Sequence, residues 1–194
     1  MSVYPIRHGE TEWSLNGRHT GVTDLPLTAN GRRLAAALKP VLARQTFALV
    51  LTSPMQRARE TCELAGLGGQ AIVEPDLMEW NYGDYEGLTT AQIQAQRPGW
   101  LIFRDGCPHG ETPAEVAARA DRVIDRARRA DGGPAEGDAA LFGHGHILRV
   151  LAARWIGLPP EGGAHFLLGT GTLCVLGQYR DGPAIDVWNG PLGI

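Results

Sequence analysis

An arginine, a histidine and a glycine stand side by side at Arg7, His8 and Gly9, where a short apolar run ends. A guanidinium can hold phosphate oxygens in a planar fork, and a neutral imidazole can attack phosphorus. Glycine beside them lets the backbone come close to a ligand. These three residue types in this order indicate transfer of a phosphoryl group to His8.

Three further residues suit the same chemistry and lie in separate segments: Arg57, Glu79 and His144. Phosphoryl transfer mainly needs positioning and charge stabilisation around three oxygens, which two arginines and a second histidine can supply without a metal. A glutamate near the leaving oxygen can donate the proton that the leaving group needs. For His8 to attack, one ring nitrogen must be unprotonated, so the other should donate to a nearby carbonyl.

The chain alternates short apolar runs with helical patterns, which predicts an α/β fold with a doubly wound, mostly parallel sheet flanked by helices. Strands are predicted at 3–7, 47–52 and 139–143, helices from Thr28, Ser53 and Thr112 and through Ile147 to Trp155, and a surface connection at 131–138. Residues 173–179 and 184–188 flank a turn and predict a C-terminal antiparallel hairpin. Pro5 leaves two alternatives: the first strand ends early, or Pro5 lies where no N–H is needed.

The residues suited to phosphoryl transfer follow predicted strands directly. Arg7 and His8 come after the first strand, Arg57 comes shortly after the second, and His144 follows the strand at 139–143. Parallel strands bring their carboxyl ends to one edge of the sheet, where ligands bind. We therefore expect these side chains to meet at that edge.

The run Arg7 to Thr11, followed in order by Arg57, Glu79 and His144, resembles the histidine phosphatase superfamily, which includes the phosphoglycerate mutases. By this resemblance His8 becomes phosphohistidine and Glu79 is the proton donor. The other three catalytic residues, which hold the phosphoryl oxygens, are Arg7, Arg57 and His144. The resemblance also implies substrate contacts from Ser14, Thr20, Gly21, Tyr82 and Gly145. It implies no metal and no cofactor.

The resemblance covers nearly the whole chain, so we expect a single domain over 1–194 with a lid-like insertion at 88–110. The mutases carry a lysine and an arginine pair in that segment, whereas this chain has only Arg97 and Arg104 there. This departure favours a phosphatase. The segment from Glu79 to Gly87 resembles a sub-branch of sedoheptulose-bisphosphatase-type enzymes and bacterial acid phosphatases. Within it, Arg104 and Arg18 are candidates for a second phosphate.

The expected function is a broad-specificity acid phosphatase acting on small phosphorylated metabolites, such as sugar phosphates, through a phosphohistidine intermediate. The alternatives are a phosphoglycerate mutase, a specific sedoheptulose or fructose bisphosphatase and, from another class, a non-catalytic phosphate-binding regulatory module. A metal site built on His144 and His146 lacks an accompanying carboxylate cluster.

The bulk composition is that of a globular protein. The net charge of −3 does not favour nucleic acid, and no apolar stretch reaches the length of a membrane span. The three cysteines form no close pair in sequence, which favours a reducing, cytoplasmic location. A homodimer is compatible with the sequence, since a surface that pairs two sheets would read as core.

Overall fold

The computed structural model describes residues 1–130 and 137–190, which form a six-stranded sheet in the order β3-β2-β4-β1-β5-β6. The strands are β1 (Val3–Arg7), β2 (Phe47–Thr52), β3 (Ile72–Val73), β4 (Asp138–Gly143), β5 (Leu173–Tyr179) and β6 (Gly182–Gly190). β1 to β4 are parallel, whereas β5 and β6 are antiparallel. The predicted mostly parallel sheet and the C-terminal hairpin are confirmed; β3, only two residues long, was not predicted.

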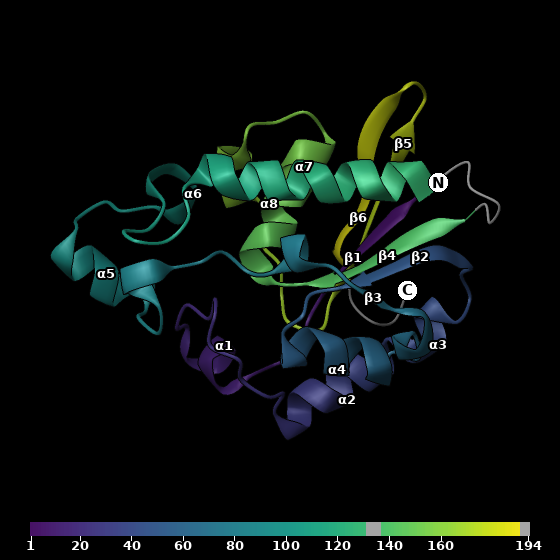
Figure 1. Cartoon of the computed structure of the whole chain (residues 1–194), viewed down its shortest axis with the longest axis horizontal. Helices are drawn as coiled ribbons and strands as arrows, with labels where there is room; N and C mark the ends of the chain where they lie inside the picture. The colour runs from purple at the N-terminus through teal and green to yellow at the C-terminus, as the bar shows by residue number, and fades with distance from the viewer. Residues whose placement is uncertain (131–136, 191–194) are drawn as a thin grey trace.

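Helices cover both faces of the sheet (Figure 1). α7 (Pro113–Ala130) and α8 (Gly145–Trp155) lie on one face, and α2 (Ala29–Ala37), α3 (Lys39–Leu42) and α4 (Gln56–Leu64) lie on the other. The short helices α1 (Glu12–Asn16), α5 (Thr90–Gln96) and α6 (Ile102–Asp105) lie on the side away from the N-terminus, at the left of Figure 1. Four 3₁₀ helices complete the set: η1 (Gly68–Gln70), η2 (Pro75–Leu77), η3 (Gly83–Tyr85) and η4 (Pro160–His165).

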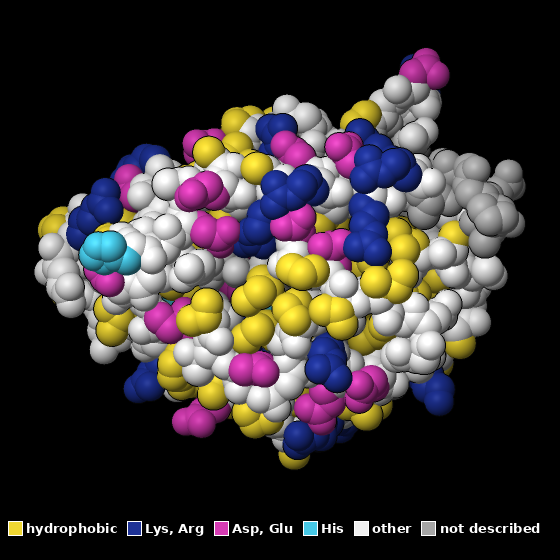
Figure 2. All heavy atoms as spheres, in the orientation of Figure 1, with side chains coloured by type: hydrophobic (Ala, Val, Ile, Leu, Met, Phe, Trp, Pro, Cys, Tyr) yellow, Lys and Arg dark blue, Asp and Glu magenta, His cyan; other side chains and the backbone are white. Residues whose placement is uncertain are grey.

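The long helix α7 shows how the sequence pattern produces the packing. The apolar residues that recur at three- and four-residue spacing along this helix are all buried: Val116, Ala120, Val123, Ile124 and Ala127. Burial of a Val or Ile side chain contributes roughly 1.5–3 kcal/mol. The outer side of the helix is charged, and Figure 2 shows arginine and acidic side chains mixed over this face. There Arg122 pairs with Asp76 at 2.7 Å.

Two predicted helices differ in their bounds. The helix predicted from Thr28 is divided into α2 and α3 at Leu38, because Pro40 cannot donate to the preceding turn. The helix predicted from Ser53 begins at Gln56. The Ser53 N–H instead donates to Phe142 O at 2.9 Å, which extends the pairing of β2 with β4 by one residue. Of the connection predicted at 131–138, residues 131–136 lie outside the described residues.

β1 runs through Pro5 without interruption, which settles the alternative left open by the sequence. Pro5 is opposite Leu141 of β4, and the recorded pairs with β5, from Val3 and Ile6, lie on either side of it. The strand therefore continues to Arg7 and delivers His8 to the carboxyl edge. In residues 1–130 and 137–190, no helix has both the length and the apolar character to cross a bilayer.

Candidate active site

Three neighbouring parallel strands end at the site. β1 ends at Arg7, which lies opposite Gly143 at the end of β4, and β2 ends beside β4 on its other side. The His8 N–H donates to Gly143 O at 3.0 Å, so the loop after β1 stays attached to the sheet. This register places His8 next to His144, with ring centroids 5.1 Å apart.

His8 is held as a neutral imidazole with one nitrogen available. Its side chain is buried, and Nδ1 lies 2.7 Å from the carbonyl oxygen of Gly9. A carbonyl can only accept, so Nδ1 carries the proton and Nε2 keeps its lone pair. Burial, and then the positive charges of Arg7 and Arg57, hold the pKa of His8 well below its usual value. The ring therefore stays uncharged and nucleophilic at neutral and mildly acidic pH.

Arg7 carries an unsatisfied donor beside this nucleophile. Its Nη1 donates to the carbonyl of Leu168, but Nε has no hydrogen-bond partner although it is buried. Among the described residues it is the one buried side-chain nitrogen or oxygen in this condition. Burial lowers the pKa of Arg7, yet a guanidinium remains charged in proteins. A buried cation with a free N–H is costly by itself and suits an anionic ligand.

Arg57 and His144 form a second pair behind His8. Arg57 is fully buried; its Nε donates to His144 Nδ1 at 3.1 Å, and its other nitrogens donate to the carbonyls of Thr20, Gly21 and Thr23. Because Nδ1 accepts, His144 carries its proton on Nε2 and donates it to Ser53 Oγ at 2.8 Å. Burial, followed by Arg57, lowers the pKa of His144 well below its usual value. Arg57 thus connects the histidine to the loop at 17–26.

Glu79 is anchored at the N-terminus of α8. Its Oε1 accepts from the backbone N–H groups of Trp80 at 2.9 Å and Ile147 at 3.0 Å, and its Oε2 accepts from His146 N at 3.0 Å. A carboxylate at this position also interacts favourably with the helix dipole. The side chain is buried but lines the cavity that His8 faces.

A cavity of about 210 Å³ lies over these residues. Seven of the ten predicted site residues line it: Arg7, His8, Ser14, Thr20, Glu79, Tyr82 and Gly145. The other three are Arg57, Gly21 and His144, which the structure places outside the lining. Gly145 lies against the Arg7 guanidinium, where an added Cβ would be 3.3 Å from Cζ. Residues from several separate segments therefore line one cavity.

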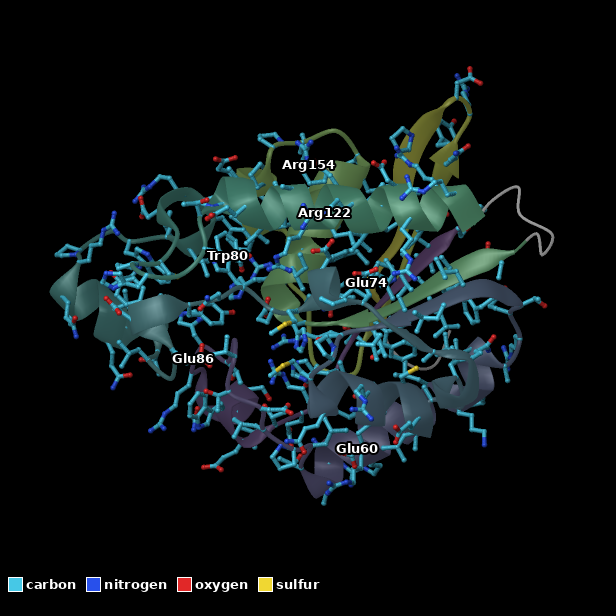
Figure 3. The ribbon with its side chains drawn as sticks, viewed as in Figure 1. Glu60, Glu74, Trp80, Glu86, Arg122 and Arg154 are labelled. Carbon is cyan, nitrogen blue, oxygen red and sulfur yellow. The ribbon has the colours of Figure 1, made fainter. Side chains whose placement is uncertain are left out.

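Gly21 is required for close packing of the loop. A Cβ there would come within 2.5 Å of Trp80 O. Its N–H donates to both carboxylate oxygens of Glu86 at 3.0 Å, and the N–H of Thr23 also donates to Glu86. Figure 3 shows Glu86 near α1, at the end of the molecule that carries α5. Glu86 therefore binds N–H groups of the same loop whose carbonyl groups bind Arg57.

His19, which the sequence marks as a histidine to watch because it precedes Thr20, lines the cavity, and so do His146 and Arg149, which the sequence did not indicate as substrate contacts. Tyr82 Oη lies 2.6 Å from His146 Nδ1, and burial raises the pKa of this phenol and lowers that of the imidazole. Tyr82 therefore donates to a neutral ring. Arg149 lies five residues after His144, more than one turn into α8. Its short spacing from a predicted site residue was the signal in the sequence that could have identified it as a cavity residue.

The two arginines proposed for a second phosphate are placed differently. Arg18 lines the cavity, with its guanidinium carbon 5.9 Å from the Trp13 ring centroid. Arg104 does not line it; its guanidinium bonds to Asp105 and to the carbonyl of Gly99. Arg149 lines the cavity as Arg18 does, whereas Arg104 does not.

Comparison with known proteins gives consistent results. Residues 3–191 match the histidine phosphatase superfamily (branch 1). The chain is 39% identical to an acid phosphatase of Mycobacterium tuberculosis, over 89% of this chain and 84% of that protein. It is 38% identical to sedoheptulose 1,7-bisphosphatase of Saccharomyces cerevisiae, over 79% of this chain and 66% of the yeast protein. The solved structure of Rv3214 from Mycobacterium tuberculosis superimposes with a TM-score of 0.91 at 37% identity, covering 97% of this chain and 96% of that one. The chain belongs to branch 1 of the histidine phosphatase superfamily.

Proposed function

We propose that this protein is a phosphatase that hydrolyses small phosphorylated metabolites through a phosphohistidine at His8. The observation that carries the proposal is the unsatisfied, buried Nε of Arg7 beside the free Nε2 of His8. An anion-binding donor and a nucleophile meet there in a cavity of about 210 Å³. The name of the Mycobacterium tuberculosis relative, acid phosphatase, supports the same activity.

The first step forms a bond from His8 Nε2 to phosphorus and breaks the ester P–O bond. The N–H groups of Arg7 stabilise the oxygens that gain charge. Glu79, in its protonated form, gives its proton to the leaving alcohol. Arg57 and His144 act from behind the cavity, where their contacts hold the loop and the His144 ring in place.

The second step releases phosphate. Water attacks phosphorus, the P–N bond to His8 breaks, and the water proton passes to Glu79, which is then ready for another cycle. The Gly9 carbonyl keeps the His8 proton on Nδ1 throughout, so the same nitrogen is released that attacked. No metal or cofactor enters this sequence of steps.

The test measures phosphate release from sugar phosphates, phosphoglycerates and p-nitrophenyl phosphate without added metal. In parallel, the phosphorylated protein is trapped by denaturing it in the absence of acid. His8→Ala should abolish both the trapped phosphate and turnover, by about 10⁴-fold or more. His165→Ala is the matched control, because that histidine is exposed and lies outside the cavity. Wild-type turnover by His8→Ala would overturn the proposal. Binding of phosphate without turnover by the wild type would identify a regulatory module.

A bisphosphate substrate is the second candidate, favoured by the position of Arg149 and Arg18 on the cavity wall. Two cations on the wall of the cavity that holds His8 suit a second phosphate on the same molecule. The relative from Saccharomyces cerevisiae is named sedoheptulose 1,7-bisphosphatase. Interconversion of phosphoglycerates in place of phosphate release would identify a mutase in the same assay.

A further inference from the structure

A second cavity of about 190 Å³ adjoins the catalytic cavity. Four residues line both: His19, Thr90, His146 and Arg149. Beyond them the second cavity is lined by Trp100, Leu101, Ile102, Phe103 and Ala164. We call it the aromatic chamber. A ligand attached to a phosphoryl group at His8 would reach the chamber beside these four shared residues.

Several polar groups of the chamber already have partners within the protein. The indole N–H of Trp100 donates to Gly106 O at 2.8 Å, which leaves its ring carbons to face the chamber. His19 Nε2 lies 3.4 Å from Thr90 Oγ1, and His146 Nδ1 is bound to Tyr82. Arg149 donates from Nε and Nη2 to the carbonyls of Gly163 and Ala164. These atoms therefore have no need of a polar group on an occupant.

The two histidines in the wall are also uncharged. Burial lowers the pKa of His19 to about 4 and holds that of His146 well below its usual value. Above mildly acidic pH both rings are neutral and act as flat, weakly polar surfaces. They pack at aromatic distances, His19 against Trp100 at 5.7 Å and His146 against Phe103 at 5.2 Å.

Arg149 also favours a flat occupant over an aliphatic one. Its guanidinium carbon is 4.5 Å from the centroid of the Phe103 ring, so the cation already contacts one aromatic side chain. Guanidinium groups stack on aromatic rings. The size agrees as well, since an apolar cavity of about 150 Å³ holds a benzene molecule.

We propose that the aromatic chamber binds an aromatic ring of the substrate's alcohol portion, so that the preferred substrates are phosphomonoesters that carry such a ring a short link away from the phosphate. The inference rests on the proposed phosphatase activity and specifies which esters that activity selects. A ring that leaves water for this chamber contributes to binding in proportion to the apolar area buried.

The experiment compares 2-phenylethyl phosphate with ethyl phosphate, since both release primary alcohols of similar acidity. We expect kcat/KM of the wild type to be higher for the phenyl ester by about 10-fold or more. Ala164→Trp should bring this ratio close to one by filling the chamber. Leu167→Trp is the matched control, because it adds the same side chain three residues away at a residue that does not line the chamber.

A second variant removes part of the wall. Leu101 is 52% exposed and lines the chamber, so Leu101→Ser should lower the ratio without a large cost to folding. Inhibition by inorganic phosphate should be the same in all these proteins, which shows that the His8 end is intact. Failure to release phosphate from either ester would overturn the proposed function itself. Release from both esters at equal kcat/KM, or an unchanged ratio in Ala164→Trp, would overturn the chamber while the phosphatase activity stands.

Discussion

The two ends of the ligand-binding region are built in different ways. At the His8 end, the side chains follow strand ends, and backbone groups fix them: Gly9 O holds His8, and three backbone N–H groups hold Glu79. At the far end, the aromatic chamber is assembled from residues 100–103, Ala164 and the four shared residues. Residues 100–103 and Ala164 belong to the segment around α6 and to η4, whereas His146 and Arg149 lie on α8; Leu101 is half exposed.

This difference indicates that the His8 end carries out the reaction, whereas the far end determines which substrates are preferred. Residues at the carboxyl ends of parallel strands have the same position in every protein with this fold. A reaction that depends on them can therefore be shared by proteins that act on different substrates. The walls of the far end depend on how 88–110 and η4 lie against α8. We therefore expect changes at the His8 end to alter all substrates, and changes at the far end to alter their ranking.

The largest effect among these tests should come from Glu79→Gln. The amide cannot protonate a leaving group, so sugar phosphates should slow by about 10²–10⁴-fold. p-Nitrophenyl phosphate should slow far less, because its phenolate leaves without a proton. The comparison is made from kcat/KM for the two esters, which covers the steps up to release of the alcohol and leaves out the later attack of water that Glu79 also assists. Glu60→Gln is the control. Glu60 lies on α4, does not line the cavity, and pairs with Arg32 of α2 (Figure 3). Equal slowing of both esters would show that Glu79 is not the acid.

The same division explains what the sequence could predict. Strand ends at Arg7 and Gly143 and the buried face of α7 follow from apolar patterns that the structure reproduces. Two local details depended on chain neighbours that a pattern does not show. Pro40 divided a helix, and the Ser53 N–H extended a strand pair.

The predicted residues outside the cavity lining differ from the others by contacts that no spacing reveals. Arg57 is turned toward the carbonyls of the loop at 17–26, and the Gly21 N–H is taken by Glu86. Arg149 was missed because an arginine on a helix usually reads as a surface residue. Its place on the wall depends on η4, whose carbonyls fix its guanidinium.

An intermediate effect is expected from Arg149→Gln. If a second anionic group binds beside Arg149, where the two cavities share lining residues, kcat/KM for a bisphosphate should fall by about 10- to 100-fold. The value for the corresponding monophosphate should change little. Sugar mono- and bisphosphates are compared as a ratio, which cancels any general loss from the released η4 carbonyls. Arg104→Gln is the control, because Arg104 is bound to Asp105 outside the cavity. An unchanged ratio would leave ring binding as the role of the far end.

The smallest effect concerns the free energy of unfolding. It tests whether water reaches the side chain of His19, which lines both cavities. His19 has a folded-state pKa of about 4, against 6.5 for the free side chain. Between these values the unfolded chain binds a proton that the folded protein does not, so the free energy of unfolding falls as the pH drops from 6.5 towards 4. The full loss from this residue is on the order of 3 kcal/mol.

Urea unfolding of wild type and His19→Gln at about pH 7 and about pH 4.5 measures this loss. The variant should lose less stability on acidification, by about 2 kcal/mol, because it has no imidazole to protonate at this position. His165→Gln replaces an exposed histidine and should lose as much as the wild type. An equal loss in wild type and His19→Gln would mean that His19 accepts its proton in the folded state. Water would then reach the ring between the two cavities, and an aromatic substrate group would have to displace it in order to bind.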